Sequence, residues 1–349
     1  MLRKNNITDV CFVSRRWTYR GNKTGFEHFS DYLDNVKLIN EAKFNRPYRL
    51  LKWLAERSQS DAYTSFSLSV ELESFIYAVC RRSRLVHYFY GDYDLHYAPR
   101  MFGFIKVPVL ASFHNPPGEL KRRIKKTNFL KKLRGAVLLG NNQKAYFHDF
   151  CPEVPAEVIR HGVDCDFFKP LPENNIIADP TVLIVGGHLR DWELISRFLT
   201  GVRKAMPNIK AQFVIPSFLE KNIPKAEWIR NTHPVTDEEL RAFYQTSSFL
   251  FFAPLDCVAS NAVVEALACG LPIIAPEVGA IRDYVNNDCG YITKSGNVSE
   301  MISAAHELVS NHSLRRRMSL ACRQQSLTLD WKVIREQYYD FYRRLGFIF

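Results

Sequence analysis

The chain lacks the features that mark membrane-spanning, secreted and zinc-ribbon proteins. No apolar run in its 349 residues reaches the roughly 18 residues of a membrane-spanning helix. The N-terminal segment has a short apolar stretch and no small-residue cleavage site, so a signal peptide is not expected. The eight cysteines include no Cys-x-x-Cys pair, which argues against a zinc ribbon or a disulfide framework and fits a reducing compartment. We therefore expect a cytoplasmic protein.

Glycine and proline are not enriched, and the sequence holds no internal repeat or low-complexity stretch. With 16 glycines and 17 prolines, the chain is neither collagen-like nor linker-like. It is 46% apolar and 24% charged, which is typical of a globular protein and argues against global disorder. At about 150 residues per domain, its length predicts roughly two domains.

The excess positive charge is confined to the first half of the chain. Residues 1–170 hold 28 Lys and Arg against 17 Asp and Glu, a net charge of +11, whereas residues 171–349 hold 19 of each kind. The segment 121–134 alone carries eight cations. Such asymmetry indicates that one half faces something anionic.

The apolar residues around this basic segment do not form one stripe. On a helical wheel Leu120 and Ile124 fall together, whereas Phe129, Leu130 and Leu133 fall on another side. The segment is therefore either a surface that contacts anionic lipid, worth about 1 kcal/mol per engaged cation, or a solvated basic helix.

Apolar runs alternate with turns and amphipathic segments, which predicts an α/β fold. A proline-rich segment without helical or strand period, 164–180, separates two such series. We place the domains at 1–168 and 169–330, followed by an aromatic-rich helix at 331–349. The expected strands are 9–14, 85–91, 107–113, 135–140 and 157–164 in the first series, and 181–187, 210–216, 248–254, 271–276 and 290–293 in the second.

The segment 251–285 carries the strongest functional signal. A strand ends at Ala253-Pro254, a loop follows, and a helix is expected to begin near Ser260-Asn261. A helix N-terminus presents backbone N–H groups and a positive dipole end, so it can hold a diphosphate. Glu265 lies about one turn into this helix, where its carboxylate can accept hydrogen bonds from two ribose hydroxyls. For a lone Glu, an ordinary solvent-facing position is the alternative.

The stretch from Glu265 to Ala275 resembles the donor-binding signature of retaining glycosyltransferase family 4, also called group 1, which has the GT-B fold. That signature runs Glu, seven residues, Glu, then Ala-hydrophobic-Ala-x-Gly-x-Pro-hydrophobic-hydrophobic-Ala. Its second half matches this chain well. The family's first Glu, which lies by the donor sugar, falls on Cys257, and the neighbouring Asp256 is the expected substitute.

Three further stretches resemble the family in the expected order: 158–170, 183–187, and Trp331-Lys332 with the tail behind it. Residues 105–345 resemble the family in their sequence motifs, whereas residues 9–104 resemble it only in the order of the expected strands and helices. It implies two Rossmann-like domains whose parallel sheets face one another across a cleft. The first domain would take the acceptor, the second the nucleotide sugar, and the last helix would cross back to the first domain.

The resemblance also implies roles for individual residues. Glu265 is carried over as the ribose ligand, and the backbone of Ser260, Asn261 and Ala262 as the diphosphate contacts. His114, which follows a predicted strand, takes the family's role at the donor sugar; a histidine that only fixes its loop is the alternative.

Other positions are less clear from the resemblance. The family's Arg after Val-Gly falls on Gly187. Arg190 either neutralises the donor phosphates or pairs with Asp191 or Glu193 on the surface. Gly25 closes a loop that sits where the family has its glycine-rich acceptor loop, and a glycine there lets a backbone approach a phosphate or an acceptor.

The function implied is a metal-independent, retaining transfer of a sugar from a UDP- or GDP-linked donor to a glycan or lipid-linked acceptor, in surface polysaccharide or glycolipid synthesis. No metal or other cofactor is expected. The base pocket is expected near 233–235, and the basic segment 121–134 predicts peripheral attachment to the inner face of the membrane.

Three other hypotheses stay open. The departures at Cys257 and Gly187 motivate a catalytically inactive sugar-nucleotide-binding protein on the same scaffold. A sugar-nucleotide epimerase shares the fold. Nucleic-acid binding would rest on the charge of the first half alone, since no nucleic-acid motif accompanies it, and no nucleic-acid partner is expected.

Overall fold

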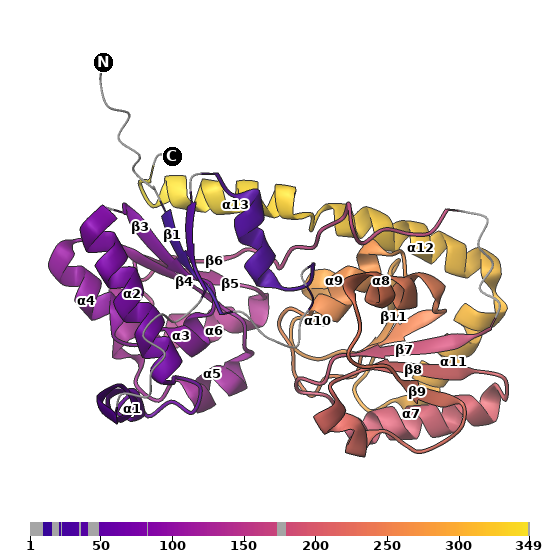
Figure 1. Ribbon diagram of the computed structural model, residues 1–349. Helices are drawn as coiled ribbons and strands as arrows, with labels where there is room; N and C mark the ends of the chain where they lie inside the picture. Colours follow the sequence, from indigo (N-terminus) through magenta and orange to yellow (C-terminus); the bar gives the residue numbers. More distant parts are fainter. Residues whose placement is uncertain are drawn as a thin grey trace. The chain divides into compact units, whose positions relative to one another are not determined.

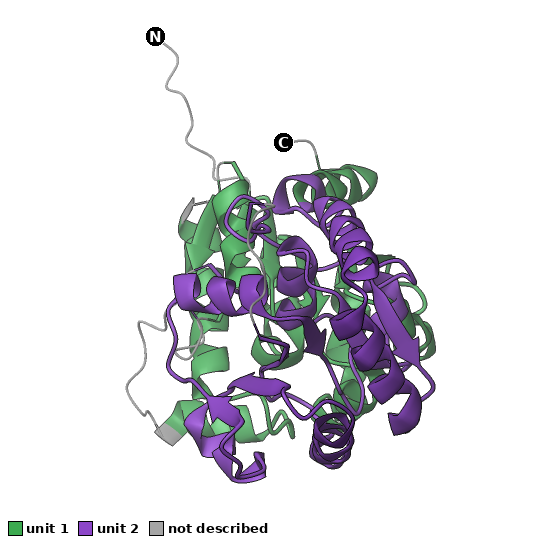
Figure 2. Cartoon of the chain, turned by 90° about the vertical axis from the view of Figure 1, so that its right-hand side faces the viewer, with its two compact units in different colours: residues 1–18, 26–159, 335–349 green, residues 19–25, 160–334 purple. Residues whose placement is uncertain are grey.

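The chain forms two compact units, each with its own parallel sheet (Figures 1 and 2). The first unit comprises residues 1–18, 26–159 and 335–349, and the second comprises 19–25 and 160–334. Within the described ranges, no helix is both long and apolar enough to cross a membrane. The computed structural model describes residues 10–15, 21, 23–34, 36–40, 49–81, 83–172 and 179–347.

The first unit is built on a six-stranded parallel sheet in the order β2-β1-β3-β4-β5-β6. Its strands are β1 (Val10–Val13), β2 (Val36–Ile39), β3 (Leu85–Tyr88), β4 (Val109–Phe113), β5 (Gly135–Leu138) and β6 (Ala156–Val158). Every residue of β1, β3, β4 and β5 is buried, as expected for parallel strands covered on both faces. The strand order reverses between β1 and β3, which leaves a crevice at their carboxyl ends.

α-Helices of 4 to 17 residues surround this sheet. They are α1 (Arg49–Glu56), α2 (Ser65–Arg81), α3 (Gly91–Asp94), α4 (Ala98–Ile105), α5 (Pro117–Arg123) and α6 (Lys144–Phe150), with 3-10 helices η1 (Phe26–Tyr32), η2 (Thr127–Lys132) and η3 (Asn141–Gln143). Of these, α1 packs on α2. The apolar side chains of α2, α4, α5 and α6 pack with those of β1, β3, β4 and β5 into one core.

The second unit repeats the architecture with another strand order, β12-β11-β10-β7-β8-β9. Its strands are β7 (Thr181–Val185), β8 (Lys210–Val214), β9 (Ile229–Asn231), β10 (Phe249–Phe251), β11 (Ile273–Pro276) and β12 (Gly290–Thr293). Its helices are α7 (Trp192–Ala205), the 3-10 helix η4 (Ser217–Asn222), α8 (Asp237–Thr246), α9 (Asn261–Ala268), α10 (Ile281–Tyr284), α11 (Val298–Ser310) and α12 (His312–Leu327).

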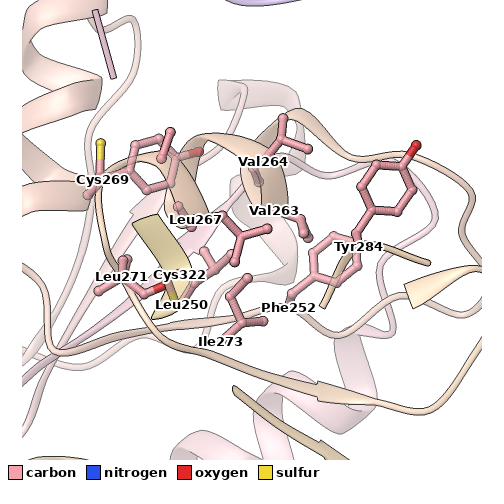
Figure 3. Packing of buried hydrophobic residues seen from close by; sticks show 14 of the residues in the cluster. Leu250, Phe252, Val263, Val264, Leu267, Cys269, Leu271, Ile273, Tyr284 and Cys322 are labelled. Atoms are coloured by element: carbon pink, nitrogen blue, oxygen red, sulfur yellow. The ribbon is translucent and has the colours of Figure 1, made fainter. Parts of the chain in front are cut away.

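Alternate residues of these strands face opposite layers of the second unit. Leu250 and Ile273 pack with Val263, Val264 and the rest of α9 in the core that Figure 3 shows. The strand residues that alternate with these point to the other side of the sheet, where they pack with α7 and α11 in a second core. In this core the rings of Phe198 and Phe251 stack with their centroids 3.8 Å apart. The prediction of two parallel-sheet, Rossmann-like units is thus confirmed.

The last helix, α13 (Trp331–Arg344), begins in the second unit and ends in the first. From Arg335 onward its tyrosines cover the first sheet: the Tyr342 hydroxyl lies 2.7 Å from Nδ1 of His87 on β3, and the Tyr338 hydroxyl lies 3.3 Å from Ser112 Oγ on β4. Burial lowers the pKa of His87 to about 3, so this imidazole is neutral and acts as a structural hydrogen-bonding group.

Several predicted elements are shorter than the sequence suggested. The expected strand 157–164 is limited to β6, because after Val158 the chain leaves the sheet and His161 to Val163 pack beside the start of α13. After Gly25 the chain forms the 3-10 helix η1. The strands β2 and β9 were not predicted; each is short and half-exposed, so it lacks the buried apolar run of the central strands.

Gly162 makes the closest backbone approach to α13. A Cβ at this position would lie 2.3 to 2.7 Å from three ring atoms of Trp331, which is itself buried. We predict that Gly162→Ala lowers the free energy of unfolding by about 1–3 kcal/mol, because the indole must move in a packed core. Urea unfolding measures the change.

Gly103→Ala is the matched control, because Gly103 lies inside α4 with open space around its Cα. It should leave stability unchanged or raise it by up to about 1 kcal/mol through helix propensity. A Gly162→Ala protein as stable as the wild type would contradict the packing described.

Candidate active site

The carboxyl edge of the second sheet carries most of the predicted residues. From β7, the chain builds β8 and β9 on one side and then β10, β11 and β12 on the other. The loops after β7 and β10 therefore diverge at a topological switch point, where ligands bind in open α/β sheets. The segments that leave these two strands contain Gly187 and Arg190 after β7, and Asp256 to Glu265 after β10.

The helix α9 begins at Asn261 as predicted, with Ser260 as its N-cap residue. The N–H groups of Val263 and Val264 both donate to the Ser260 carbonyl, at 3.0 and 3.2 Å. No described residue accepts a hydrogen bond from the N–H groups of Asn261 or Ala262. Two backbone donors and the positive end of the helix dipole are therefore available at this terminus.

Glu265 lies on the inner side of α9, where only 3% of its surface is exposed. Its Oε2 accepts a 2.8 Å hydrogen bond from the hydroxyl of Tyr244, which α8 supplies. Burial and the neighbouring Glu265 raise the pKa of Tyr244 well above its usual value, so the phenol stays protonated and donates. The carboxylate is thus held in one orientation, and an exposed Glu265 is excluded.

Arg190 is a buried cation that pairs with no carboxylate among the described residues. Its Nη2 donates to the Val185 carbonyl at 2.8 Å, its Nη1 lies 3.2 Å from the His188 carbonyl, and its guanidinium lies 4.3 Å from the centre of the Phe252 ring. Only 8% of the residue is exposed, and its Nε has no partner within the described chain. Burial lowers the pKa of Arg190 to about 10, which still leaves it protonated at neutral pH.

The surface ion pair that was the alternative for Arg190 does not form. The side chain of Asp191 instead caps α7, where it accepts from the Leu194 N–H at 2.9 Å. Glu193 is exposed in the first turn of the same helix. A buried charge without a counter-ion is costly in free energy, so this geometry favours an anionic ligand beside Arg190.

The two glycines after β7 leave room for this arrangement. Gly186 has φ +72°, in the left-handed region that favours glycine, and the position of its missing Cβ lies 3.5 Å from Nη2 of Arg190. A Cβ at Gly187 would lie 2.0 Å from Cδ1 of Leu219. A side chain at Gly187 would therefore require Leu219 to move. The guanidinium of Arg190 instead lies against the end of β7, where it donates to the Val185 carbonyl.

Cys257 has no acid–base capacity at this site. Its thiol is directed at the Val278 carbonyl, 3.4 Å away, and burial raises the pKa of the thiol to about 12. Its carbonyl accepts from the Ala280 N–H, and Gly279, with φ +56°, packs against it too closely for a Cβ. Asp256 is half-buried, accepts from the Cys257 N–H at 2.8 Å, and has a pKa raised by its burial.

His114 lies in the first unit, after β4. Its Nε2 is 2.6 Å from the Phe89 carbonyl, so this nitrogen carries the proton that it donates. The ring packs against Tyr90 and Phe26, at centroid distances of 4.4 and 4.8 Å. The backbone N–H of His114 donates to Asp92, which follows β3. The segment that follows β3, together with Phe26 of η1, therefore fixes this imidazole.

The loop before η1 belongs to the second unit by its contacts. Gly25 is buried with φ +104°, and only glycine adopts this conformation without strain. The Lys23 N–H donates to Asp237 at 3.0 Å, and its ammonium lies 3.8 Å from Asp164. Residues 16–20 and 22 of this loop lie outside the described residues.

The basic segment 121–134 is not one helix. It is divided between the end of α5 and η2, with a break at 124–126. The five apolar residues of the region are all buried in the first core, which explains why they fall on two sides of a single helical wheel: Leu120, Ile124, Phe129, Leu130 and Leu133. No apolar stripe of this segment is left for insertion into lipid.

The chain also contains two Asp-x-Asp pairs, a pattern that can bind metal–diphosphate in other proteins. Asp92 accepts from His114 and Asn115, and Asp94 forms an ion pair with Arg15 at 2.6 Å. Asp164 caps the N–H groups of two following residues, and Asp166 pairs with Lys332 at 2.7 Å. Among the described residues, no three His, Cys, Asp or Glu side chains converge as metal ligands.

Comparison with known proteins identifies the second unit. Residues 179–311 match the family described as glycosyl transferases group 1. The second unit is therefore similar to group 1 glycosyl transferases over most of its length. The matched range contains Gly187, Arg190, Asp256 and the whole of α9, so these predicted residues lie inside the transferase domain.

Two curated relatives also match the chain. A D-inositol 3-phosphate glycosyltransferase of Nocardiopsis dassonvillei is 21% identical over 53% of this chain and 49% of its own length. A phosphatidyl-myo-inositol mannosyltransferase of Propionibacterium freudenreichii is 24% identical over 68% of this chain and 65% of its own length. The chain therefore spans about half to two thirds of the length of these relatives.

A solved structure shows the same fold over nearly the whole chain. Anabaena HepE in complex with UDP-glucose superposes with a TM-score of 0.72 and 14% identity, covering 96% of this chain and 99% of that one. The sucrose-phosphate synthase of Thermosynechococcus elongatus gives a TM-score of 0.69 at 14% identity, over 97% and 88%. The predicted GT-B fold is thereby confirmed.

Three residues that shape the transferase domain were not predicted. Tyr244 and Phe252 contact Glu265 and Arg190, and Leu219 fills the space beside Gly187. No motif marks these positions, because each reaches its partner only through the packing of the domain.

The burial of Cys257 can be tested by thiol labelling. Of the eight cysteines, only Cys80 is exposed, and the other seven are buried. We predict that iodoacetamide at pH 8 modifies Cys80 in the native protein and leaves Cys257 unmodified, as read by mass spectrometry of peptides. Denatured protein should react at all sites, and labelling of Cys257 in the native state would contradict its assigned environment.

Proposed function

We propose that the protein is a glycosyltransferase that takes its sugar from a nucleoside diphosphate sugar bound at the carboxyl edge of the second sheet. The observation that carries this proposal is the buried guanidinium of Arg190, which no described carboxylate neutralises. A donor diphosphate would supply the missing negative charge. Family membership of the domain and the fold shared with a UDP-glucose complex support the same assignment.

The diphosphate would be held by Arg190 together with the free N–H groups of Asn261 and Ala262. Group transfer leaves a nucleoside diphosphate with increased negative charge on its terminal phosphate. Fixed donors and a buried cation stabilise that charge without reorganisation during the reaction. Arg190 would thereby replace the family's cation at the position of Gly187, where a side chain would have to displace Leu219.

Glu265 would bind the ribose hydroxyls, with Tyr244 fixing one of its carboxylate oxygens. The base would lie near 233–235, directly before Thr236, which caps α8. Asp256 is the half-buried carboxylate closest in sequence to the position of the family's first Glu, and together with His114 it would hold the donor sugar.

The reaction would retain the anomeric configuration and need no metal, as the family resemblance implies. The acceptor hydroxyl would attack on the face that the diphosphate leaves, and the leaving phosphate would accept the proton. Positioning and charge stabilisation would then supply most of the rate acceleration. The acceptor would be a glycan or a lipid-linked molecule, since the two curated relatives are named for an inositol phosphate and a phosphatidylinositol.

The alternative, a binding protein without turnover, rests on Cys257, where a buried thiol stands in place of a carboxylate. Incubation with UDP- and GDP-sugars separates the two functions. Release of nucleoside diphosphate supports transfer, whereas binding without release, even with acceptor extract present, supports the alternative.

Arg190→Gln tests the phosphate contact. We predict that this variant binds the preferred nucleoside diphosphate, UDP or GDP, about 10- to 100-fold more weakly, because one charge-assisted contact contributes about 1.5–3 kcal/mol. Its affinity for the free nucleoside should not change, since that ligand carries no phosphate. Arg197→Gln, an exposed residue of α7, is the control and should bind like the wild type. Equal loss for nucleoside and diphosphate would contradict the assigned role.

Glu265→Ala tests the ribose contact. Calorimetry should show at least tenfold weaker binding of both the nucleoside and the diphosphate, because two hydroxyls lose their acceptor. Glu193→Ala removes a carboxylate from the exposed first turn of α7 and should bind normally. Unchanged nucleotide affinity in a folded Glu265→Ala protein would show that the donor site is elsewhere.

A further inference from the structure

The first unit contains a cavity of about 300 Å³ that the proposed reaction does not use. It opens between the junction of α3 with α4 and the break between α5 and η2. These two segments follow the neighbouring strands β3 and β4. Its volume is at the lower end of small-molecule sites, which span about 300–1,000 Å³. It is lined by His96, Tyr97, Arg100, Lys125, Lys126, Thr127, Asn128 and Phe129.

The lining of this cavity is strongly positive. It includes Arg100, Lys125 and Lys126, and none of its residues is acidic. Lys126 donates to the Arg57 carbonyl at 2.7 Å, a neutral partner that leaves its charge uncompensated. The side chains of Arg100 and Lys125 are exposed at the mouth of the cavity and form no hydrogen bond or ion pair within the described part of the chain. By contrast, the nearby Arg122 is paired with both Glu119 and Asp61.

The walls of the cavity are fixed in place before any ligand arrives. The His96 ring packs edge-on against Tyr97 and Phe129, with centroids 4.6 and 5.5 Å apart. Glu71, fully buried below, accepts the N–H groups of His96, Tyr97 and Ala98. The Tyr97 hydroxyl donates to the Leu54 carbonyl. Such a rigid wall lowers the ordering cost of binding.

His96 adds polarity to the wall without adding charge. Burial, and then the positive charges of Lys126 and Arg100, lower the pKa of His96 to about 4. The imidazole is therefore neutral at physiological pH. The adjoining Thr127 and Asn128 supply a hydroxyl and an amide that can bond to ligand hydroxyl groups.

A smaller space of about 10 Å³ adjoins this cavity and shares four of its lining residues, His96, Lys125, Lys126 and Phe129. Its inner wall includes Asp92, whose buried Oδ1 has no hydrogen-bond partner among the residues that the structure describes. The other oxygen of Asp92 accepts the backbone N–H of His114. The positive cavity is therefore next to the cluster that fixes the candidate sugar ligand of the first unit.

We propose that this cavity binds the phosphoryl group of a phosphorylated sugar or polyol, with Arg100 and Lys125 on the phosphate oxygens and Thr127 and Asn128 on the hydroxyls. A fork-shaped guanidinium and an ammonium without competing carboxylates suit a phosphate dianion. The ligand could be a free phosphate ester or the headgroup of a phospholipid. The inference does not depend on glycosyl transfer, since binding alone reports it.

The test compares two double variants that remove the same charge. Arg100→Gln with Lys125→Gln removes two of the three cations that line the cavity, whereas Lys131→Gln with Lys132→Gln removes two exposed cations of η2 outside it. The probes are glycerol 3-phosphate, measured by calorimetry, and phosphatidylcholine vesicles containing either phosphatidylinositol or phosphatidylserine at equal surface charge, measured by sedimentation. Thermal unfolding checks that both variants are folded.

The cavity variant should bind glycerol 3-phosphate at least about tenfold more weakly than the wild type, while the η2 variant binds normally; this result assigns a soluble phosphate ester. If only vesicles containing phosphatidylinositol bind, and only the cavity variant loses them, the phosphoryl group belongs to a lipid headgroup. An equal effect of the two variants on all vesicles indicates attraction by general charge and overturns the proposal. Absence of binding to every probe also overturns it.

Discussion

The account of the second unit depends on one electrostatic constraint, a guanidinium buried without a carboxylate. Arg190 is held by two backbone carbonyls and the face of Phe252, which satisfy its geometry but do not neutralise its charge. A protein keeps such a group at a cost in stability, and a bound anion offsets that cost. The N–H groups of Asn261 and Ala262 at the start of α9, which follows the neighbouring strand β10, are further hydrogen-bond donors for an anion.

Topology explains why these groups belong to one edge of the sheet. In the second sheet, the strand order changes direction between β7 and β10, so the glycine turn with Arg190 and the helix α9 leave adjacent strands. In the first sheet, the change lies between β1 and β3, and Arg15 and Asp94 form a partly buried ion pair there. Both sheets thus concentrate polar side chains at the ends where parallel strands finish.

Sequence reasoning succeeded where the signal is continuous along the chain. The start of α9 at Asn261, the glycine that ends it and the position of Glu265 within it all come from one uninterrupted motif. The central strands were found because most of their residues are apolar. Short strands with half-exposed residues, such as β2 and β9, carry too little of this signal.

Contacts between distant segments could not be predicted in the same way. Whether Arg190 pairs with Asp191 or turns inward depends on Phe252 and the Val185 carbonyl, which only the folded sheet brings near. The inward position of Glu265 depends on Tyr244 from another helix. Likewise, the basic segment 121–134 was ambiguous on a helical wheel because two short helices, separated by a break, bury its apolar residues in different directions.

The most direct test of the central claim is a crystal structure of the protein with UDP or GDP bound. The account predicts that the diphosphate oxygens lie within hydrogen-bonding distance of the Arg190 guanidinium and of the Asn261 and Ala262 N–H groups. A nucleotide whose diphosphate makes none of these contacts, or that binds away from the carboxyl ends of β7 and β10, would contradict it.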